Sequence, residues 1–252
     1  MTGNVGLRRF VPAAAAPAPA PDAATVQAGD VSQAGGGQQA GGGQQPGPPP
    51  GGAPPQEKCE LCATEVPAEH GHVADLEQST LICACRACYL LFTHAQAGRG
   101  RYRAVPDRYL HDPARQLSVA EWDEFEIPVG LAFFLRSSQR AEERGEERGE
   151  VSAFYPSPAG ATESTLNLEK WDRLSSAHPL LRAAAADTEA ILICRGEHGV
   201  EYFLVPIDAC YELAGRMRLH WRGFDGGTEA RTSIAEFLSG VRSRSRAFRE
   251  EP

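Results

Sequence analysis

Residues 57–94 read EKCELCATEVPAEHGHVADLEQSTLICACRACYLLFTH, and this stretch decides how the ordered part of the chain begins. Its cysteines stand at CxxC and CxCxxC spacings: Cys59, Cys62, Cys83, Cys85 and Cys88. A CxxC turn offers two thiolates to one ion because the intervening backbone wraps around the metal. The chain has seven cysteines, an odd number, and shows no export signal. The pattern therefore predicts a compact metal-binding knuckle rather than a disulfide framework.

The same stretch contains more candidate ligands than one zinc ion needs, because zinc takes four ligands in a tetrahedron. Two cysteine pairs supply that number: Cys59, Cys62, Cys85 and Cys88. Three neighbours are alternates for one of these thiols: Cys83, His70 and His72. An extended strand would point His70 and His72 to the same side. We expect structural zinc, with iron as the alternative metal, and the choice of ligands stays open at this point.

The spacing of these residues also predicts local structure. We expect short strands at residues 72–76 and 80–83, joined by a turn, and a helix from about 85 to 95. Cys85 and Cys88 would lie at i and i+3 at the start of that helix, where the helix dipole favours thiolates. The metal would then tie a hairpin to the start of a helix.

The chain divides into three parts by composition. Residues 1–56 have Arg8, Arg9, Asp22 and Asp30 as their charged groups, and from Val11 onward they are almost entirely Ala, Pro, Gly, Gln and Val. Such a tail buries too little apolar surface to offset its ordering entropy, so we expect it to be disordered. We place the knuckle at residues 57–97, as a small module resembling a zinc ribbon, and a domain of unknown function at 98–252.

Strands and helices interleave in residues 98–252 without a strict βαβ repeat, which favours the α+β class. Strands are expected at 101–105, 127–136, 151–155, 189–195 and 200–205. Helices are expected at 118–125, where Ser118 and Glu121 suit a capping box, and at 166–174, 207–219 and 228–246. The charged run 139–150 is expected to be a solvated loop or a frayed helix.

Composition narrows the classes of function. The net charge of −8 disfavours a general phosphate-binding surface, although Arg99, Arg101 and Arg103 form a local basic stripe. The longest apolar run, 127–135, is too short to span a bilayer. The Ala/Pro tract lacks the apolar core of a secretory signal, so we expect a cytoplasmic protein without a membrane span.

A complete catalytic constellation is not visible in the sequence. Cys194 and Cys210 lie in apolar segments and are expected to be core thiols, while His198 and His220 have no visible partner. PSPAGATES at 156–164 lacks the lysine of a phosphate-binding loop and suits a turn with a helix cap. WRGFDGG at 221–227 is expected to be a turn; a ligand pocket would require both loops to meet beside Asp208 and His220.

The order of these motifs resembles a known family. CELC, HGHVADLE, CACRACYLLF, IPVGLAFF, FYPSPAGATES and PIDACYELAGRMRLHWRG follow one another over roughly residues 57–240. This order is similar to that of an actinobacterial family of unknown function encoded beside high-affinity uptake nickel-iron hydrogenases. The resemblance implies an accessory or maturation role, with the cysteine knuckle as a metal site and a hydrogenase or its assembly factors as the protein partner.

Three functional hypotheses follow. The first is a non-enzymatic accessory protein whose zinc folds the knuckle against the α+β domain. The second is an iron-thiolate protein for electron transfer, which would be red or brown instead of colourless. The third is nucleic-acid binding by a zinc ribbon, which the acidic composition disfavours and which would weaken steeply with salt.

Overall fold

The cysteine segment forms a hairpin followed by a short helix. The computed structural model describes residues 57–94, 96–138, 150–157, 160–164, 166–196, 199–222 and 226–250. Strand β1 (Gly71–Asp75) pairs antiparallel with β2 (Thr80–Ala84), and helix α1 (Arg86–Leu91) follows. After η2 (Ala97–Gly100), strand β3 (Tyr102–Ala104) pairs with β1 to give the order β2-β1-β3. The small sheet thus continues beyond residue 97.

A seven-stranded sheet forms the larger part, with the order β10-β4-β9-β8-β5-β6-β7. Its strands are β4 (Leu110–His111), β5 (Leu131–Ser137), β6 (Glu150–Ser157), β7 (Gly160–Ser164), β8 (Glu189–Gly196), β9 (Gly199–Pro206) and β10 (Arg246–Ala247). Its helices are α2 (Val119–Asp123), α4 (Leu168–Ala177), η3 (Pro179–Arg182), α5 (Ile207–His220) and α6 (Gly227–Arg244). The pairing is antiparallel except between β10 and β4, which matches a mixed α/β protein of the α+β type. In the described parts of the chain, no helix combines the length and apolarity that crossing a membrane requires.

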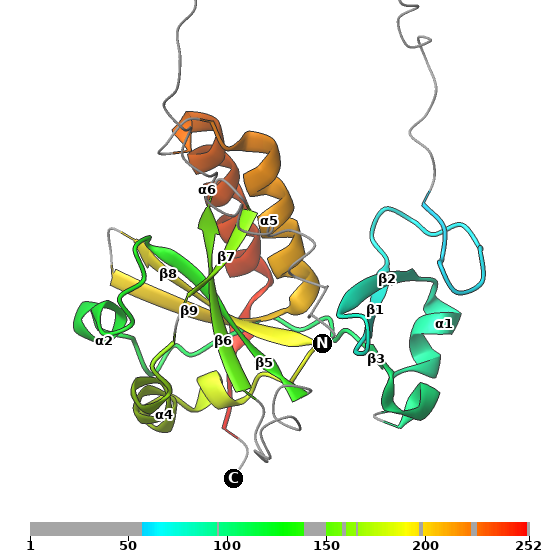
Figure 1. The fold of residues 1–252 in the computed structure, drawn as a ribbon, viewed down its shortest axis with the longest axis horizontal. Helices are drawn as coiled ribbons and strands as arrows, with labels where there is room; N and C mark the ends of the chain where they lie inside the picture. Colours follow the sequence, from blue (N-terminus) through cyan, green and yellow to red (C-terminus); the bar gives the residue numbers. More distant parts are fainter. Residues whose placement is uncertain are drawn as a thin grey trace, which may run out of the picture.

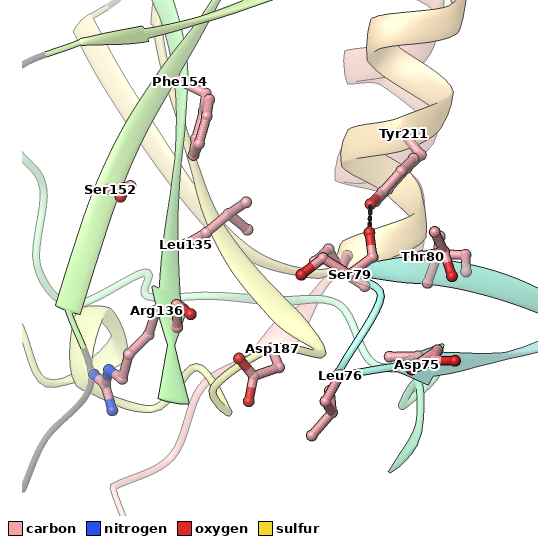
Figure 2. Close-up of a pocket in the computed structure, with 14 residues that line it drawn as sticks. Asp75, Leu76, Ser79, Thr80, Leu135, Arg136, Ser152, Phe154, Asp187 and Tyr211 are labelled. Atoms are coloured by element: carbon pink, nitrogen blue, oxygen red, sulfur yellow. Dashed lines mark hydrogen bonds between the residues drawn. The ribbon is translucent and has the colours of Figure 1, made fainter. Parts of the chain in front are cut away.

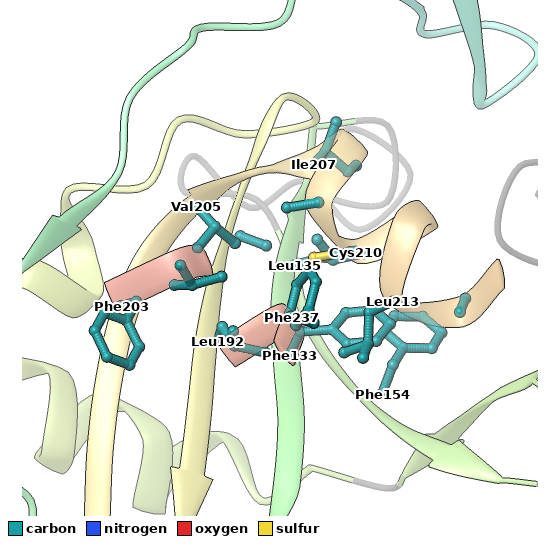
Figure 3. Packing of buried hydrophobic residues seen from close by; sticks show 14 of the residues in the cluster. Phe133, Leu135, Phe154, Leu192, Phe203, Val205, Ile207, Cys210, Leu213 and Phe237 are labelled. Atoms are coloured by element: carbon teal, nitrogen blue, oxygen red, sulfur yellow. The ribbon is translucent and has the colours of Figure 1, made fainter. Parts of the chain in front are cut away.

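Helices cover both faces of this sheet, which explains its continuous apolar strands. Figure 1 shows α5 and α6 together on one side of the sheet, and α2 and α4 on the other. Side chains alternate between faces along a strand. In β5, Phe133 and Leu135 therefore pack under α5 and α6, whereas Ala132 and Phe134 pack on the opposite face. Figure 3 shows the first of these cores.

The second core is rich in aromatic rings. Phe134 of β5 stacks on Trp171 of α4, with ring centroids 4.8 Å apart. Trp122 of α2 is also buried there. The expected capping box begins α2: the Ser118 side chain accepts from the Glu121 N–H, and the Glu121 carboxylate accepts from the Ser118 N–H. The start of α2 was therefore predictable from local sequence.

Several expected elements have different bounds. The helix expected at 85–95 ends at Leu91, and the strand expected to start at 127 starts at Leu131. Residues 128–130 form a bend that contains Pro128 and Gly130, and Pro128 has no N–H for a sheet ladder, so β5 begins only after this bend. GATES at 160–164 is strand β7, paired with β6, and not a loop before a helix.

Other expectations lie outside the described residues. These are the disorder of residues 1–56, most of the charged run 139–150, His198, and residues 223–225 of WRGFDGG. The division of the chain at residue 97 also remains a prediction.

Candidate metal centre

Four cysteine sulphur atoms converge at the base of the hairpin. They belong to Cys59, Cys62, Cys85 and Cys88, and they lie 3.5–3.9 Å from one another. A tetrahedral zinc site with Zn–S bonds of about 2.3 Å has S···S edges of about 3.8 Å. The four thiols therefore already have the spacing of a tetrahedral thiolate site and could hold one metal ion.

Short backbone hydrogen bonds build the first half of this site. The Ala63 N–H donates to the Cys59 carbonyl at 2.7 Å, and the Cys59 N–H donates to the Thr64 carbonyl at 2.8 Å. Ala63 has a φ of 62°, the left-handed conformation that closes the turn. The Glu60 N–H donates to the Cys83 carbonyl at 2.9 Å, which holds the turn against the end of β2.

The second half comes from the junction between β2 and α1. Cys85 is the extended N-cap of α1, and its carbonyl accepts from the Tyr89 N–H at 2.9 Å. Cys88 lies in the first turn of the helix, so both sulphur atoms point to the same side. The hairpin and the helix start are thus joined at the site, as the spacing predicted.

The thiols affect one another's ionisation. Hydrogen bonding with Thr64, together with the neighbouring Cys59 and Cys85, lowers the pKa of Cys62 to about 6. Desolvation and the neighbouring thiols raise the pKa of Cys88 to about 12. Cys62 is therefore readily a thiolate, while desolvation and repulsion from the neighbouring thiolates oppose the ionisation of Cys88. A bound cation would remove that repulsion, which is the electrostatic reason why such clusters bind metal ions.

The three alternates form a separate group. One ring nitrogen each of His70 and His72 and the sulphur of Cys83 lie within 4.8 Å of one another. His72 is directly opposite Cys83 in the β1-β2 ladder. The structure thus places these residues beside the four-cysteine group and not within it.

Asp208, which the ligand sets from sequence did not include, contacts this second group. Its Oδ2 lies 2.9 Å from Nδ1 of His72, although the two residues are 136 positions apart. The sequence signals an acidic residue at the start of α5 but gives no reason to pair it with the hairpin. His220 lies at the other end of α5, about 18 Å away by helix geometry. Asp208 and His220 therefore do not lie side by side.

A pocket separates the hairpin from the large sheet. Figure 2 shows Ser79 and Asp75 on the hairpin side, with Leu135 and Phe154 on the sheet side. The Tyr211 hydroxyl of α5 donates to the Ser79 carbonyl across this seam at 3.3 Å. Two carboxylates line the pocket, and each has a structural partner: Asp75 binds the Arg101 guanidinium, and Asp187 accepts from the Ser138 hydroxyl.

The remaining candidates have structural roles. Cys194 and Cys210 are buried, as expected for core thiols, and burial raises the pKa of Cys194 to about 12. In the basic stripe, Arg101 binds Asp75 and Glu77, and Arg103 lies 3.8 Å from Asp187. Because these guanidinium groups already pair with carboxylates, they are less available to bind a phosphate backbone.

Fold and site together define a mixed α/β protein with a cysteine cluster able to hold a metal ion. Residues 58–245 match a family of unknown function, DUF5947, and the chain belongs to that family. The match includes the cysteine cluster with β1, β2, α1 and β3, together called the cysteine module below, and all of the seven-stranded sheet except β10. No curated protein and no solved structure matches the chain.

Proposed function

We propose that this protein is a non-enzymatic, zinc-binding accessory protein that supports a nickel-iron hydrogenase or its maturation in the cytoplasm. In this proposal zinc binds Cys59, Cys62, Cys85 and Cys88 and stabilises a knuckle of the zinc-ribbon kind. The observation that carries the metal part is the tetrahedral spacing of the four sulphur atoms. The hydrogenase part rests on the resemblance in motif order described above.

The cysteine module has few buried apolar residues, and two of them, Ala74 and Val105, pack into the core beneath α5 and α6. This supports a structural role for the metal. Apart from Cys59, the module's buried apolar residues are Val66, Val73, Ala74, Ala84, Ala104 and Val105. Side chains of this size bury little apolar surface, and modules this small usually need a metal or disulfides to fold. Four protein ligands leave no open position, which is typical of structural zinc.

The distances between the sulphur atoms also restrict the iron alternative to a single iron ion. The sulphur atoms surround the space of one ion, whereas an iron–sulphur cluster separates its thiolates by several intervening atoms. Single iron remains the competing metal, since tetrahedral thiolate sites suit both ions.

Exposed leucines on the module support a role in protein binding. Leu61 lies within the CELC turn, and Leu90 and Leu91 lie on α1, which has no buried residue. All three are more than one-third exposed. They leave apolar surface beside the metal site, where a partner protein could bury it.

Metal analysis of protein purified without oxygen tests the site. We expect zinc, no visible absorption band, and loss of that zinc in Cys59→Ser and Cys88→Ser together with unfolding of the module. Cys194→Ser is the matched control, because its thiol is buried in the sheet core and should leave the metal content unchanged. Iron with thiolate charge-transfer bands would replace this proposal with electron transfer.

Co-purification with hydrogenase subunits tests the partner. The full chain should retain them, and a variant with Ser at positions 61, 90 and 91 should lose them while keeping its zinc and its thermal transition. Val119→Ser with Leu168→Ser is the control, since these residues are exposed on the large domain. Equal recovery of subunits with both variants would contradict a partner surface on the module.

A further inference from the structure

The group formed by His70, His72 and Cys83 has the arrangement of a metal site in its own right. The ligand atoms lie within 4.8 Å of one another. His72 and Cys83 form a cross-strand pair, and such side chains share one face of the sheet. His70 precedes His72 by two residues and contacts it, with ring centroids 4.9 Å apart. Two imidazoles and one thiol therefore converge from one face of the hairpin.

Hydrogen bonds orient both imidazole rings. Nδ1 of His70 donates to the Pro67 carbonyl at 2.9 Å, and Nδ1 of His72 lies 2.9 Å from Asp208 Oδ2. Each ring therefore has Nε2 left for another ligand. Metal-binding histidines characteristically donate the other ring nitrogen to a carbonyl or carboxylate in this way.

Nε2 of His70 is the most informative atom of the group. The His70 side chain is only 6% exposed, and among the described residues its Nε2 has no hydrogen-bond partner. A buried polar atom without a partner costs free energy, and proteins rarely tolerate one. A metal ion bound to this nitrogen would satisfy it and would explain why the ring is held in this orientation.

The charges around the group favour a cation. Glu57 Oε2 lies 3.6 Å from His70 Nδ1. The Glu60 carboxylate accepts the Cys83 N–H at 2.8 Å, and Asp208 contributes a third acidic group. Three carboxylates therefore lie around the two imidazoles and the thiol.

We propose that His70, His72 and Cys83 bind a second divalent transition-metal ion of the zinc type, with Asp208 as the residue that positions His72. Binding displaces the thiol proton of Cys83 to solvent. Three protein ligands leave the fourth position open, which distinguishes this site from the closed four-cysteine site. The His72 side chain is 25% exposed, so water or a ligand atom from another molecule can reach the ion. The proposal does not depend on which metal occupies the four-cysteine site.

Metal titration of the full chain tests this second site. Protein stripped by a chelator is titrated without oxygen with Co²⁺, whose absorption reports thiolate ligation, and then with Zn²⁺. We expect two ions per chain in the unaltered protein and one in Cys83→Ser or His70→Gln. The remaining ion in these variants should keep the spectrum of four-thiolate ligation. Cys62→Ser should instead remove that spectrum, so failure at one site is distinguishable from failure at the other.

The role of Asp208 is tested by affinity. Asp208→Asn should weaken binding of the second ion about 10–100-fold, as loss of a carboxylate behind a metal-bound histidine does, without changing the number of ions bound. Glu212→Gln is the matched control, since Glu212 lies one turn further along α5 and pairs with Arg216. Unchanged affinity in Asp208→Asn would remove Asp208 from the site. One ion in the unaltered protein, or two ions in both Cys83→Ser and His70→Gln, would overturn the proposal.

Discussion

Asp75 shows how one residue holds the tip of the cysteine hairpin. Its carboxylate is buried, and it accepts hydrogen bonds from the N–H groups of Glu77 and Gln78 and from the Arg101 guanidinium. Burial alone would raise the pKa of Asp75, but the hydrogen bonds from Arg101 and the Gln78 N–H, with the Arg101 charge, outweigh it and lower the pKa. Asp75 is therefore a structural carboxylate that connects the hairpin turn to the start of β3.

Acid should loosen this turn. Because the folded-state pKa of Asp75 lies below the unfolded value of about 3.9, its stabilisation is fully present above about pH 4 and is lost as the pH falls through the folded pKa. Asp75→Asn should weaken the hairpin at neutral pH and flatten the pH dependence of stability below pH 4. Urea unfolding at a series of pH values measures both effects. If the free energy of unfolding depended on pH in the same way in Asp75→Asn and in the unaltered protein, Asp75 would not make this contribution.

At the scale of elements, the HGH sequence at the start of β1 combines two packing requirements. His70 and His72 belong to the metal-ligand group with Cys83, whereas Gly71 between them is covered by Tyr89 of α1. A Cβ at position 71 would lie 2.7 Å from Cδ2 of Tyr89. The ring cannot easily swing away, because its hydroxyl donates to the Val105 carbonyl at 3.0 Å. The glycine is what lets α1 lie directly on β1.

Gly71→Ala should therefore separate α1 from β1. We expect a loss of about 1–3 kcal/mol in the stability of the module, the usual cost of overpacking, measured by denaturant unfolding in the presence of metal. Gly215→Ala in α5 is the control, because nothing lies within 4 Å of its Cβ position and alanine should stabilise that helix by up to about 1 kcal/mol. Equal effects at the two glycines would contradict the packing argument.

For the whole molecule, the two sheets differ in what holds them together. The seven-stranded sheet has apolar cores on both faces, while the cysteine module contributes mainly small side chains. The seam between the two includes polar contacts such as Tyr211 with Ser79 and His72 with Asp208. A structural zinc site supplies about 10–16 kcal/mol of apparent binding energy, which is ample for a module of this size.

Chelation should therefore unfold the module and leave the large domain folded. Hydrogen exchange should show lost protection in β1, β2 and β3 and retained protection in β5, β8 and β9. Phe134→Ala is the converse change: it should destabilise the large domain by about 3–5 kcal/mol and leave the metal content unchanged. A single unfolding transition that includes both parts on chelation would show that they form one cooperative unit.

Local sequence was sufficient for much of this structure, because local patterns have local physical causes. The CxxC and CxCxxC spacings predicted a turn and a helix start with their thiols together, and the Ser118–Glu121 box predicted the start of α2.

Tertiary structure alone decided the rest. Strands β4 and β10 have two residues each, too few for any periodicity, and exist through pairing with distant strands. His72 and Asp208 meet only because the sheet brings the start of α5 to the hairpin. The separation of His70, His72 and Cys83 from the four-cysteine site likewise depends on strand register, which spacing along the chain does not encode.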